Sequence, residues 1–185
     1  MPTYLALLRG INVGGRNKVA MAELRQLAES LGHADVATYI QSGNLVFTSE
    51  GADTVALADA LEQEIAGRLG VKSAVVVLSR DELARAIADN PFPGEPDPRR
   101  VHAVFRRDER SPEAVRVVAA LQQKCRDAGS ADEVVIVGRT LFLHTPDGFG
   151  RSDLAAQLFR SSAQAAGTAR NWATVTKLMA MLDTD

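Results

Sequence analysis

The sequence predicts an α+β fold of two tandem ferredoxin-like repeats, each with the element order β-α-β-β-α-β and a mainly antiparallel sheet. Short apolar runs alternate with stretches of helical periodicity, and glycine turns join neighbouring runs into two hairpins. A proline-rich segment divides the chain, and the same order of elements occurs on both sides of it. We therefore expect a first repeat at residues 1–90, a linker at 91–100 and a second repeat with a C-terminal helix at 101–185.

The first repeat begins with a predicted buried strand at residues 3–9, which read TYLALLR. After a glycine-rich loop, leucines at helical spacing between residues 24 and 31 predict a helix, and Gly32 ends it. Two strand-like runs follow at 36–41 and 44–49.

A tight hairpin is expected between these two runs. Only Ser42 and Gly43 separate them, and glycine tolerates the positive φ that such turns require. A second helix is predicted over 57–69, where leucine or isoleucine recurs every four residues and Gly70 ends the pattern.

The run 73–78 predicts another buried strand. Ser79 and Glu82 then have the spacing of a capping box, which predicts a short helix that ends near Asn90. Residues 91–98 contain four prolines in eight positions, so they can neither continue a helix nor form a central strand. This segment is the expected linker.

The second repeat is predicted to begin with a strand at 101–105. Ser111 is the expected cap of a helix that has Pro112 at its first position. Residues 132–145 predict a second hairpin, which turns at Gly138 and its arginine neighbour.

The last elements are a helix at 152–165, a short strand at 167–170 and a final helix capped by Asn171. Four apolar residues of this final helix are expected to face inward: Val175, Leu178, Met179 and Leu182.

The composition excludes several classes of protein. Hydrophobic residues make up 46% of the 185 residues and charged residues 24%, which predicts a packed core and not a disordered chain. The formal net charge of −2 argues against a general nucleic-acid binder. We find neither the cationic start of a signal peptide nor the roughly 20 apolar residues of a membrane-spanning helix, so we expect a soluble, cytoplasmic protein without a membrane partner.

No metal site is predicted. Cys125 is the only cysteine, which leaves no internal disulfide and no cysteine-rich metal site, and we interpret it as a small residue on a helix. His33, His102 and His144 are scattered and lack ligand spacing.

Residues 7–18, LLRGINVGGRNK, form the most unusual stretch. Gly10 and Gly15 have the spacing of a phosphate-binding P-loop, but Arg16 and Asn17 stand where that motif requires lysine and a hydroxyl residue. We therefore reject a P-loop nucleotide hydrolase. The loop still contains the groups from which anion sites are built: exposed backbone N–H groups, a following helix start and three cations. The alternative is a surface turn with solvated cations.

Two further polar motifs have competing interpretations. Residues 41–44, QSGN, are explained by a plain turn. In RNWATV (170–175), an arginine at a helix start opposes the helix dipole unless an anion or carboxylate is near. Alternatively, Trp172 belongs to the core and Arg170 forms a surface ion pair.

The stretches LLRGINVGGRNKVAMAEL, YIQSGNLVF and RNWATVTKL resemble domain-of-unknown-function family 1697, a widespread family of uncharacterised bacterial proteins. The resemblance implies an α+β fold with two structural repeats, and it implies no reaction. Asp153 and Ala173 depart from the family pattern, because they stand where lysine and asparagine are common. The family's motif positions are Arg9, Gly10, Asn12, Gly14, Gly15, Lys18, Ser42, Gly43, Asn44, Arg170, Asn171 and Trp172.

Together these motifs predict a binding site for a small anionic ligand, phosphate or nucleotide-like, at the 9–18 loop. Arg9, Lys18 and Arg170 would supply charge, and Asn12 and Asn44 would orient the ligand. The alternatives are a module that binds single-stranded nucleic acid, which the 5% aromatic content disfavours, and a purely structural or interaction protein. The sequence assigns no reaction, cofactor or oligomeric state.

Overall fold

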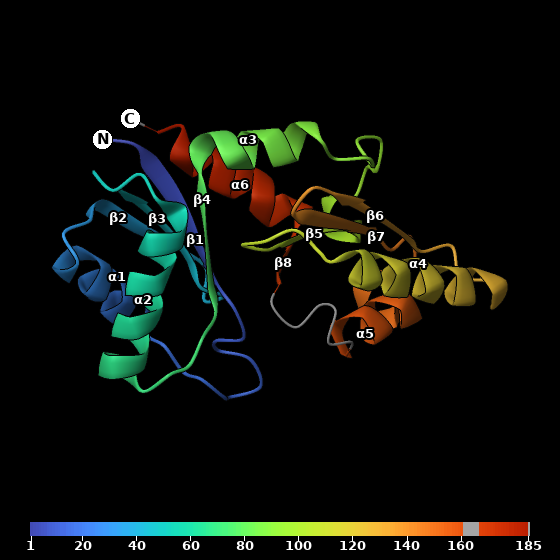
Figure 1. Ribbon diagram of the computed structural model, residues 1–185, viewed down its shortest axis with the longest axis horizontal. Helices are drawn as coiled ribbons and strands as arrows, with labels where there is room; N and C mark the ends of the chain where they lie inside the picture. The colour runs from blue at the N-terminus through green and yellow to red at the C-terminus, as the bar shows by residue number, and fades with distance from the viewer. Residues whose placement is uncertain (161–166, 185) are drawn as a thin grey trace. The chain divides into compact units, whose positions relative to one another are not determined.

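The computed structural model describes residues 1–160 and 167–184 (Figure 1). The chain folds as two compact units, the first formed by Met1–Arg85 with Lys177–Asp185 and the second by Ala86–Thr176. Each unit contains one four-stranded antiparallel sheet, and the sheets have the orders β2-β3-β1-β4 and β6-β7-β5-β8. The predicted α+β class is confirmed.

In the first unit, α1 and α2 cover one face of the sheet (Figure 1). Tyr4, Ala6 and Leu8 alternate along β1 toward these helices and join the core. Leu5 and Leu7 face the other way and are also fully buried, so β1 is buried on both faces. The elements are β1 (Thr3–Leu8), α1 (Met21–Ser30), β2 (Ala34–Tyr39), β3 (Asn44–Thr48), α2 (Thr54–Leu69), β4 (Val75–Ser79) and α3 (Arg80–Ala88).

Several predicted boundaries in this unit are confirmed. Helix α2 ends at Gly70, whose φ of 65° is left-handed. The capping box that opens α3 is present in both directions: the Ser79 N–H donates to Glu82 Oε2 over 2.9 Å, and the Glu82 N–H donates to Ser79 Oγ over 3.2 Å. The Arg80 guanidinium binds Asp183 Oδ1 at 2.7 Å and so fastens the C-terminal segment to the start of α3.

The hairpin between β2 and β3 differs from the prediction in its length. We expected a strand over 36–41 and a two-residue turn, but β2 ends at Tyr39, which pairs with Asn44. The loop therefore has four residues, Ile40–Gly43. Ile40 has the side chain of a strand residue but a φ of 49°, and this left-handed conformation ends the strand.

In the second unit, α4 and α5 pack on one face of the sheet (Figure 1). Ser111 caps α4 as predicted, since its Oγ accepts a hydrogen bond from the Ala114 N–H. The predicted helix at 152–165 is present as far as Arg160, and 161–166 lie outside the described residues. The elements are β5 (Val101–Phe105), α4 (Pro112–Asp127), β6 (Glu133–Val137), β7 (Thr140–His144), α5 (Asp153–Arg160) and β8 (Thr168–Asn171), with short 3-10 turns at Pro98–Arg100 and Phe149–Arg151. The last helix, α6 (Trp172–Leu182), begins in this unit, and its residues from Lys177 belong to the first unit.

The proline-rich segment is fixed to this sheet by side chains. Glu95 Oε2 lies 2.6 Å from His144 Nε2, and the Phe92 ring packs against the same imidazole with centroids 5.1 Å apart. Within the described ranges, no helix is both long and apolar enough to cross a membrane.

Candidate functional site

The glycine loop between β1 and α1 is a miniature hairpin. The Arg16 N–H donates to the Val13 carbonyl over 3.0 Å, and these two residues form an isolated antiparallel bridge. Gly14 and Gly15 lie between them with φ of 58° and 75°. A two-residue turn of type I′ needs positive φ at both central positions, which explains the glycine pair.

Asn12 fastens this hairpin to the rest of the unit. Its Nδ2 donates to the carbonyls of Val19 and Gln41 over 2.9 and 2.8 Å, and its Oδ1 accepts from the Val19 N–H over 2.9 Å. Asn17 closes the loop from the other side, because its Nδ2 donates to the Gly10 carbonyl over 3.0 Å. Both asparagines have positive φ, a conformation that asparagine tolerates better than most residues.

The structure brings the 9–18 loop and the 40–43 loop together. The Leu8 N–H donates to the Gly43 carbonyl over 2.8 Å. Gly43 has a φ of 79°, as we predicted, and a Cβ at this position would lie 2.7 Å from Leu8 Cβ and 2.8 Å from Ile11 Cδ1. Glycine is therefore required here both for its conformation and for the close approach of the two loops.

The two asparagines expected to orient a ligand have internal partners instead. Asn44 is completely buried, and its Nδ2 donates to the Tyr39 carbonyl and to Ser42 Oγ, each over 2.9 Å. It has no exposed surface to offer a ligand, and the Asn12 side chain is bonded at both its nitrogen and its oxygen. These residues hold the two loops in shape.

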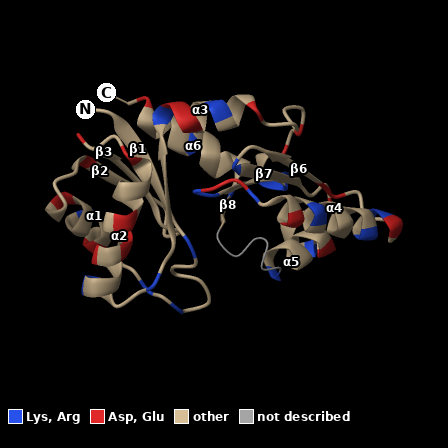
Figure 2. Cartoon of the chain, viewed as in Figure 1, with Lys and Arg blue, Asp and Glu red and all other residues tan. Residues whose placement is uncertain are grey.

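The loop cations differ in exposure. Arg9 is half-buried, and its backbone is tied to the segment before β4 through Ser73 Oγ and the Ala74 carbonyl. Arg16 and Lys18 are exposed, and their side chains make no ion pair or hydrogen bond with any described residue. No acidic residue precedes Glu23, so the connection from β1 to α1 carries positive charge alone (Figure 2).

The third predicted motif belongs to the second unit, where each residue has a local role. Asn171 caps α6, with its Oδ1 accepting from the Thr174 N–H over 2.9 Å. Trp172 packs against Phe142, with ring centroids 6.2 Å apart. Arg170 Nη1 donates to the Ala169 carbonyl, and burial lowers the pKa of Arg170 to about 10.

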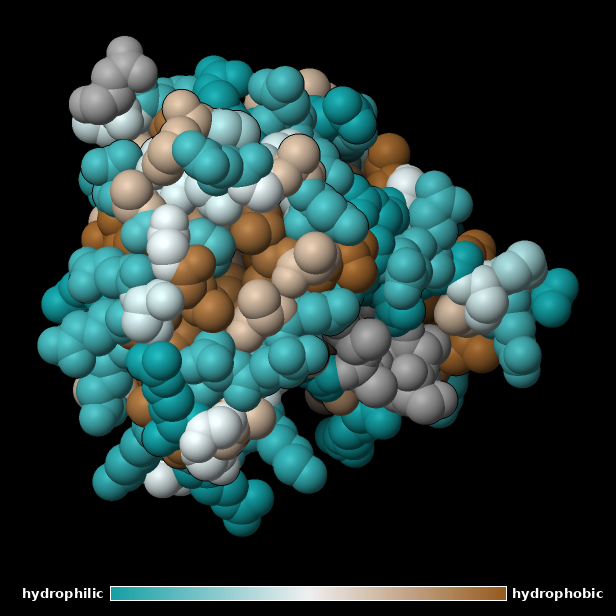
Figure 3. Space-filling model, turned by 60° about the vertical axis from the view of Figure 1, so that its left-hand side comes forward, coloured by the Kyte–Doolittle hydropathy of each residue, from teal (hydrophilic) through white to brown (hydrophobic). Residues whose placement is uncertain are grey.

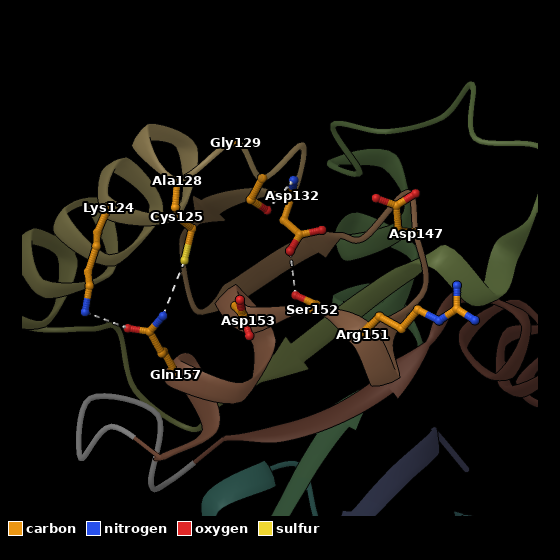
Figure 4. Close-up of a pocket in the computed structure, with 11 residues that line it drawn as sticks. Lys124, Cys125, Ala128, Gly129, Asp132, Asp147, Arg151, Ser152, Asp153 and Gln157 are labelled. Carbon is orange, nitrogen blue, oxygen red and sulfur yellow. Dashed lines mark hydrogen bonds between the residues drawn. The ribbon is translucent and has the colours of Figure 1, made fainter.

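A pocket of about 430 Å³ lies in the second unit, between the end of α4 and the start of α5 (Figure 4). Ser152 Oγ donates to Asp132 Oδ2 over 2.7 Å and also accepts from the Ala155 N–H, so this buried pair serves as the cap of α5. Gln157 lies between Cys125 Sγ and Lys124 Nζ, at 3.5 Å from each (Figure 4).

This pocket lacks an activated nucleophile among its described residues. Burial, helped by the charges of Asp153 and Asp132, raises the pKa of the Cys125 thiol and so disfavours the thiolate. Sequence reasoning did not find the Ser152–Asp132 pair. A serine directly before an amphipathic helix is a cap signal, but its carboxylate partner lies 20 residues away and has no local signature.

No group of three or more His, Cys, Asp or Glu side chains in the described ranges could hold a metal ion. Among the residues that the sequence predicted for a site, those of the 9–18 and 40–43 loops in the first unit form the best-defined polar cluster. Their glycines and asparagines serve the backbone, and their cations point to solvent.

Comparisons with known proteins place the chain in a family. A solved structure described as conserved bacterial protein SP0830 from Streptococcus pneumoniae is similar with 27% sequence identity and a TM-score of 0.77, over 98% of this chain and 99% of that one. The search of curated proteins gave no match. The family model described as "Protein of unknown function (DUF1697)" matches residues 1–142. The chain therefore belongs to this family of proteins of unknown function, DUF1697, as the three sequence motifs predicted.

Proposed function

We propose that the protein binds a small anionic ligand, phosphate or nucleotide-like, at the 9–18 loop. One observation carries this proposal. Arg16 and Lys18 lie exposed in a loop that the hydrogen bonds of Asn12 and Asn17 hold in shape, neither has an ionic partner among the described residues, and the segment from β1 to α1 contains no acid. Unneutralised cations on a hydrogen-bonded loop are suited to binding an anion, because charge-assisted hydrogen bonds are strong and the backbone of the loop need not be reordered on binding.

The backbone supports the same assignment. The N–H groups of Gly14 and Gly15 make no hydrogen bond to any described residue, and both glycines are exposed. Helix α1 starts three residues after Lys18, and its N-cap residue, Ala20, supplies no side-chain hydrogen bond. Free N–H groups and a helix N-terminus both favour negative charge.

The roles of the predicted residues divide accordingly. Arg9, Lys18 and the amides of Gly14 and Gly15 would face the ligand, together with Arg16. Asn12 and the loop residues Gly10, Ser42 and Asn44 would keep the loops in shape. Arg170, Asn171 and Trp172 belong to the second unit, where each has a local partner.

The sheets do not favour single-stranded nucleic acid as the ligand. Proteins that bind single strands on a sheet need exposed aromatic side chains to stack on the bases. Tyr4 and Phe47 of the first sheet are 3% and 0% exposed, and Phe105 and Phe142 of the second are 2% and 0% exposed. A small anion is therefore the better candidate.

The proposal also covers the architecture and the location of the protein. It includes a tandem ferredoxin-like architecture, the domain bounds 1–90 and 101–185 with the linker 91–100, and a cytoplasmic location. The matching strand orders of the two sheets support the first of these, because both are the order of a split β-α-β unit.

Isothermal titration calorimetry with phosphate, pyrophosphate and a panel of nucleotides tests the binding function. We expect binding by the wild-type protein and a loss of about tenfold in affinity for the double variant Arg16→Ala/Lys18→Ala, since each exposed charge contributes about 0.5–1 kcal/mol. The matched control is Arg116→Ala, which removes an exposed arginine of α4. Equal binding by all three proteins, or binding by none, would contradict the proposal.

A further inference from the structure

We infer that the anion bound at the 9–18 loop carries an apolar body, as a phosphate monoester with an aromatic or aliphatic group does. This inference rests on the proposed function and names the ligand class of the same site. It is carried by two exposed aliphatic side chains: Val13, which pairs with Arg16, and Ile40, which lies in the loop that the Asn12 side chain binds.

Val13 shares the glycine hairpin with a cation. Its side chain is 66% exposed, the largest exposed fraction among the large apolar side chains described. It pairs with Arg16 across the type I′ turn, and directly paired residues of an antiparallel ribbon project from the same face, with Cβ atoms about 5 Å apart. The hairpin therefore presents an apolar group and a guanidinium side by side.

Ile40 supplies the second aliphatic side chain from the neighbouring loop. It is 52% exposed and has a φ of 49°. A β-branched residue in the left-handed region is strained, and an isoleucine that is half exposed gains less from burial to offset that strain than a core residue does. Because Ile40 combines a strained backbone with an exposed apolar side chain, we interpret it as a residue kept for function.

One hydrogen bond joins the chain neighbours of Val13 and Ile40. Asn12, next to Val13 in the chain, donates to the carbonyl of Gln41, which follows Ile40. The other large exposed apolar residues, Met1, Val55, Val115 and Val117, lie at the N-terminus or on the outer faces of α2 and α4. Isolated apolar residues of that kind are normal. Figure 3 shows, on one face of the molecule, hydrophobic atoms gathered between hydrophilic ones.

The charge of the two loops indicates which kind of ligand they would bind. The two loops together contain Arg9, Arg16 and Lys18 and no acidic residue, so an apolar ligand without an anionic group would leave the cations unused. A ligand with both groups would satisfy the guanidinium with its phosphate and cover the aliphatic side chains with its body.

The test compares inorganic phosphate with phenyl phosphate by isothermal titration calorimetry. We expect phenyl phosphate to bind about tenfold more tightly to the wild-type protein, the gain that covering two half-exposed aliphatic side chains would give. Ile40→Asn and Val13→Asn should each bring the ratio of the two affinities toward one. Because asparagine tolerates positive φ, Ile40→Asn should also leave the unfolding midpoint unchanged or raise it.

The outcomes separate the two proposals. If the wild-type protein binds neither compound, the anion-binding function fails and this inference fails with it. If it binds both equally, or if both asparagine variants keep the preference for phenyl phosphate, the anion site stands and the apolar contact is wrong. Binding to anionic phospholipid vesicles or to a single-stranded oligonucleotide without binding to phenyl phosphate would also overturn it, because the ligand would then be a macromolecular surface. Val13→Asn keeps the test decisive if Ile40→Asn does not fold.

Discussion

Asn12 joins two loops that are distant in sequence, through a hydrogen bond of 2.8 Å from its Nδ2 to the carbonyl oxygen of Gln41. The same side chain also binds both the N–H and the carbonyl of Val19, at the approach to α1. One amide thus fixes the glycine hairpin, the β2–β3 hairpin and the entry to the first helix.

Replacing Asn12 by alanine should therefore lower the free energy of unfolding by about 2–3 kcal/mol, because three hydrogen bonds are lost and alanine resists positive φ. Asn17→Ala is the matched control. It also changes an asparagine with positive φ, but it removes only the bond to the Gly10 carbonyl and should cost about 1 kcal/mol. Urea unfolding followed by circular dichroism measures both. Equal losses would show that the link to Gln41 contributes little.

Gly43→Ala should be more destabilising than Gly14→Ala. Both positions have positive φ, but a Cβ at Gly43 would lie 2.7 Å from Leu8 Cβ, whereas nothing lies within 4 Å of a Cβ at Gly14. We expect a loss of about 2 kcal/mol or more at Gly43 and about 1 kcal/mol at Gly14. The same unfolding experiment compares them, and similar midpoints for the two variants would mean that the close approach of the loops is easily relaxed.

Acid should destabilise the second unit through His102, whose ring packs on Phe149 with centroids 4.3 Å apart. Burial lowers the pKa of His102 from 6.5 to about 4, so between these values the unfolded chain takes up a proton that the folded protein does not. The free energy of unfolding therefore falls as the pH falls from 6.5 to about 4, by up to about 3 kcal/mol.

His102→Phe keeps an aromatic ring on Phe149 and removes the titration, so this variant should lose less stability between about pH 7 and about pH 4 than the wild type does. Urea unfolding monitored by the fluorescence of Trp172, the only tryptophan, reports on the second unit. Burial also lowers the pKa of His33 in the first unit. Because His33 is present in both the wild type and His102→Phe, its titration does not contribute to the difference between them. An identical loss in both proteins would exclude His102 as the titrating group.

The proline-rich segment should open when its attachment to the sheet is removed. His144 binds Glu95 and packs against Phe92, so His144→Ala removes both attachments at once. We expect limited proteolysis within residues 91–98 to become about tenfold faster, because the protease can then cleave the locally opened segment and the whole unit need not unfold first. A cleavage rate equal to that of the wild type would show that the segment is held by its backbone alone.

The fold was largely predictable from local signals. The capping box of Ser79 and Glu82, the Ser111 cap and the Gly70 end of α2 are each encoded within a few residues, and all are confirmed. Ile40 was misassigned to a strand because periodicity reads side chains and cannot detect a positive φ imposed by a loop.

The sequence pointed to the two loops of the candidate site but not to the roles of their asparagines. The two loops do meet, yet whether Asn12 and Asn44 face solvent or backbone carbonyls depends on tertiary packing, which a linear pattern does not contain. The pocket beside Asp132 was missed for the same reason, since its polar pair spans two segments without a shared motif.

The most direct test of the anion site is a titration with inorganic phosphate followed by the backbone ¹H–¹⁵N spectrum of the protein. We predict saturable shifts of the Gly14, Gly15 and Lys18 amides, centred on the type I′ turn, that disappear in Arg16→Ala/Lys18→Ala and persist in Arg116→Ala. If these three amide signals do not shift even at phosphate concentrations that saturate shifts elsewhere in the protein, the loop is a structural turn with solvated cations and the central claim is wrong.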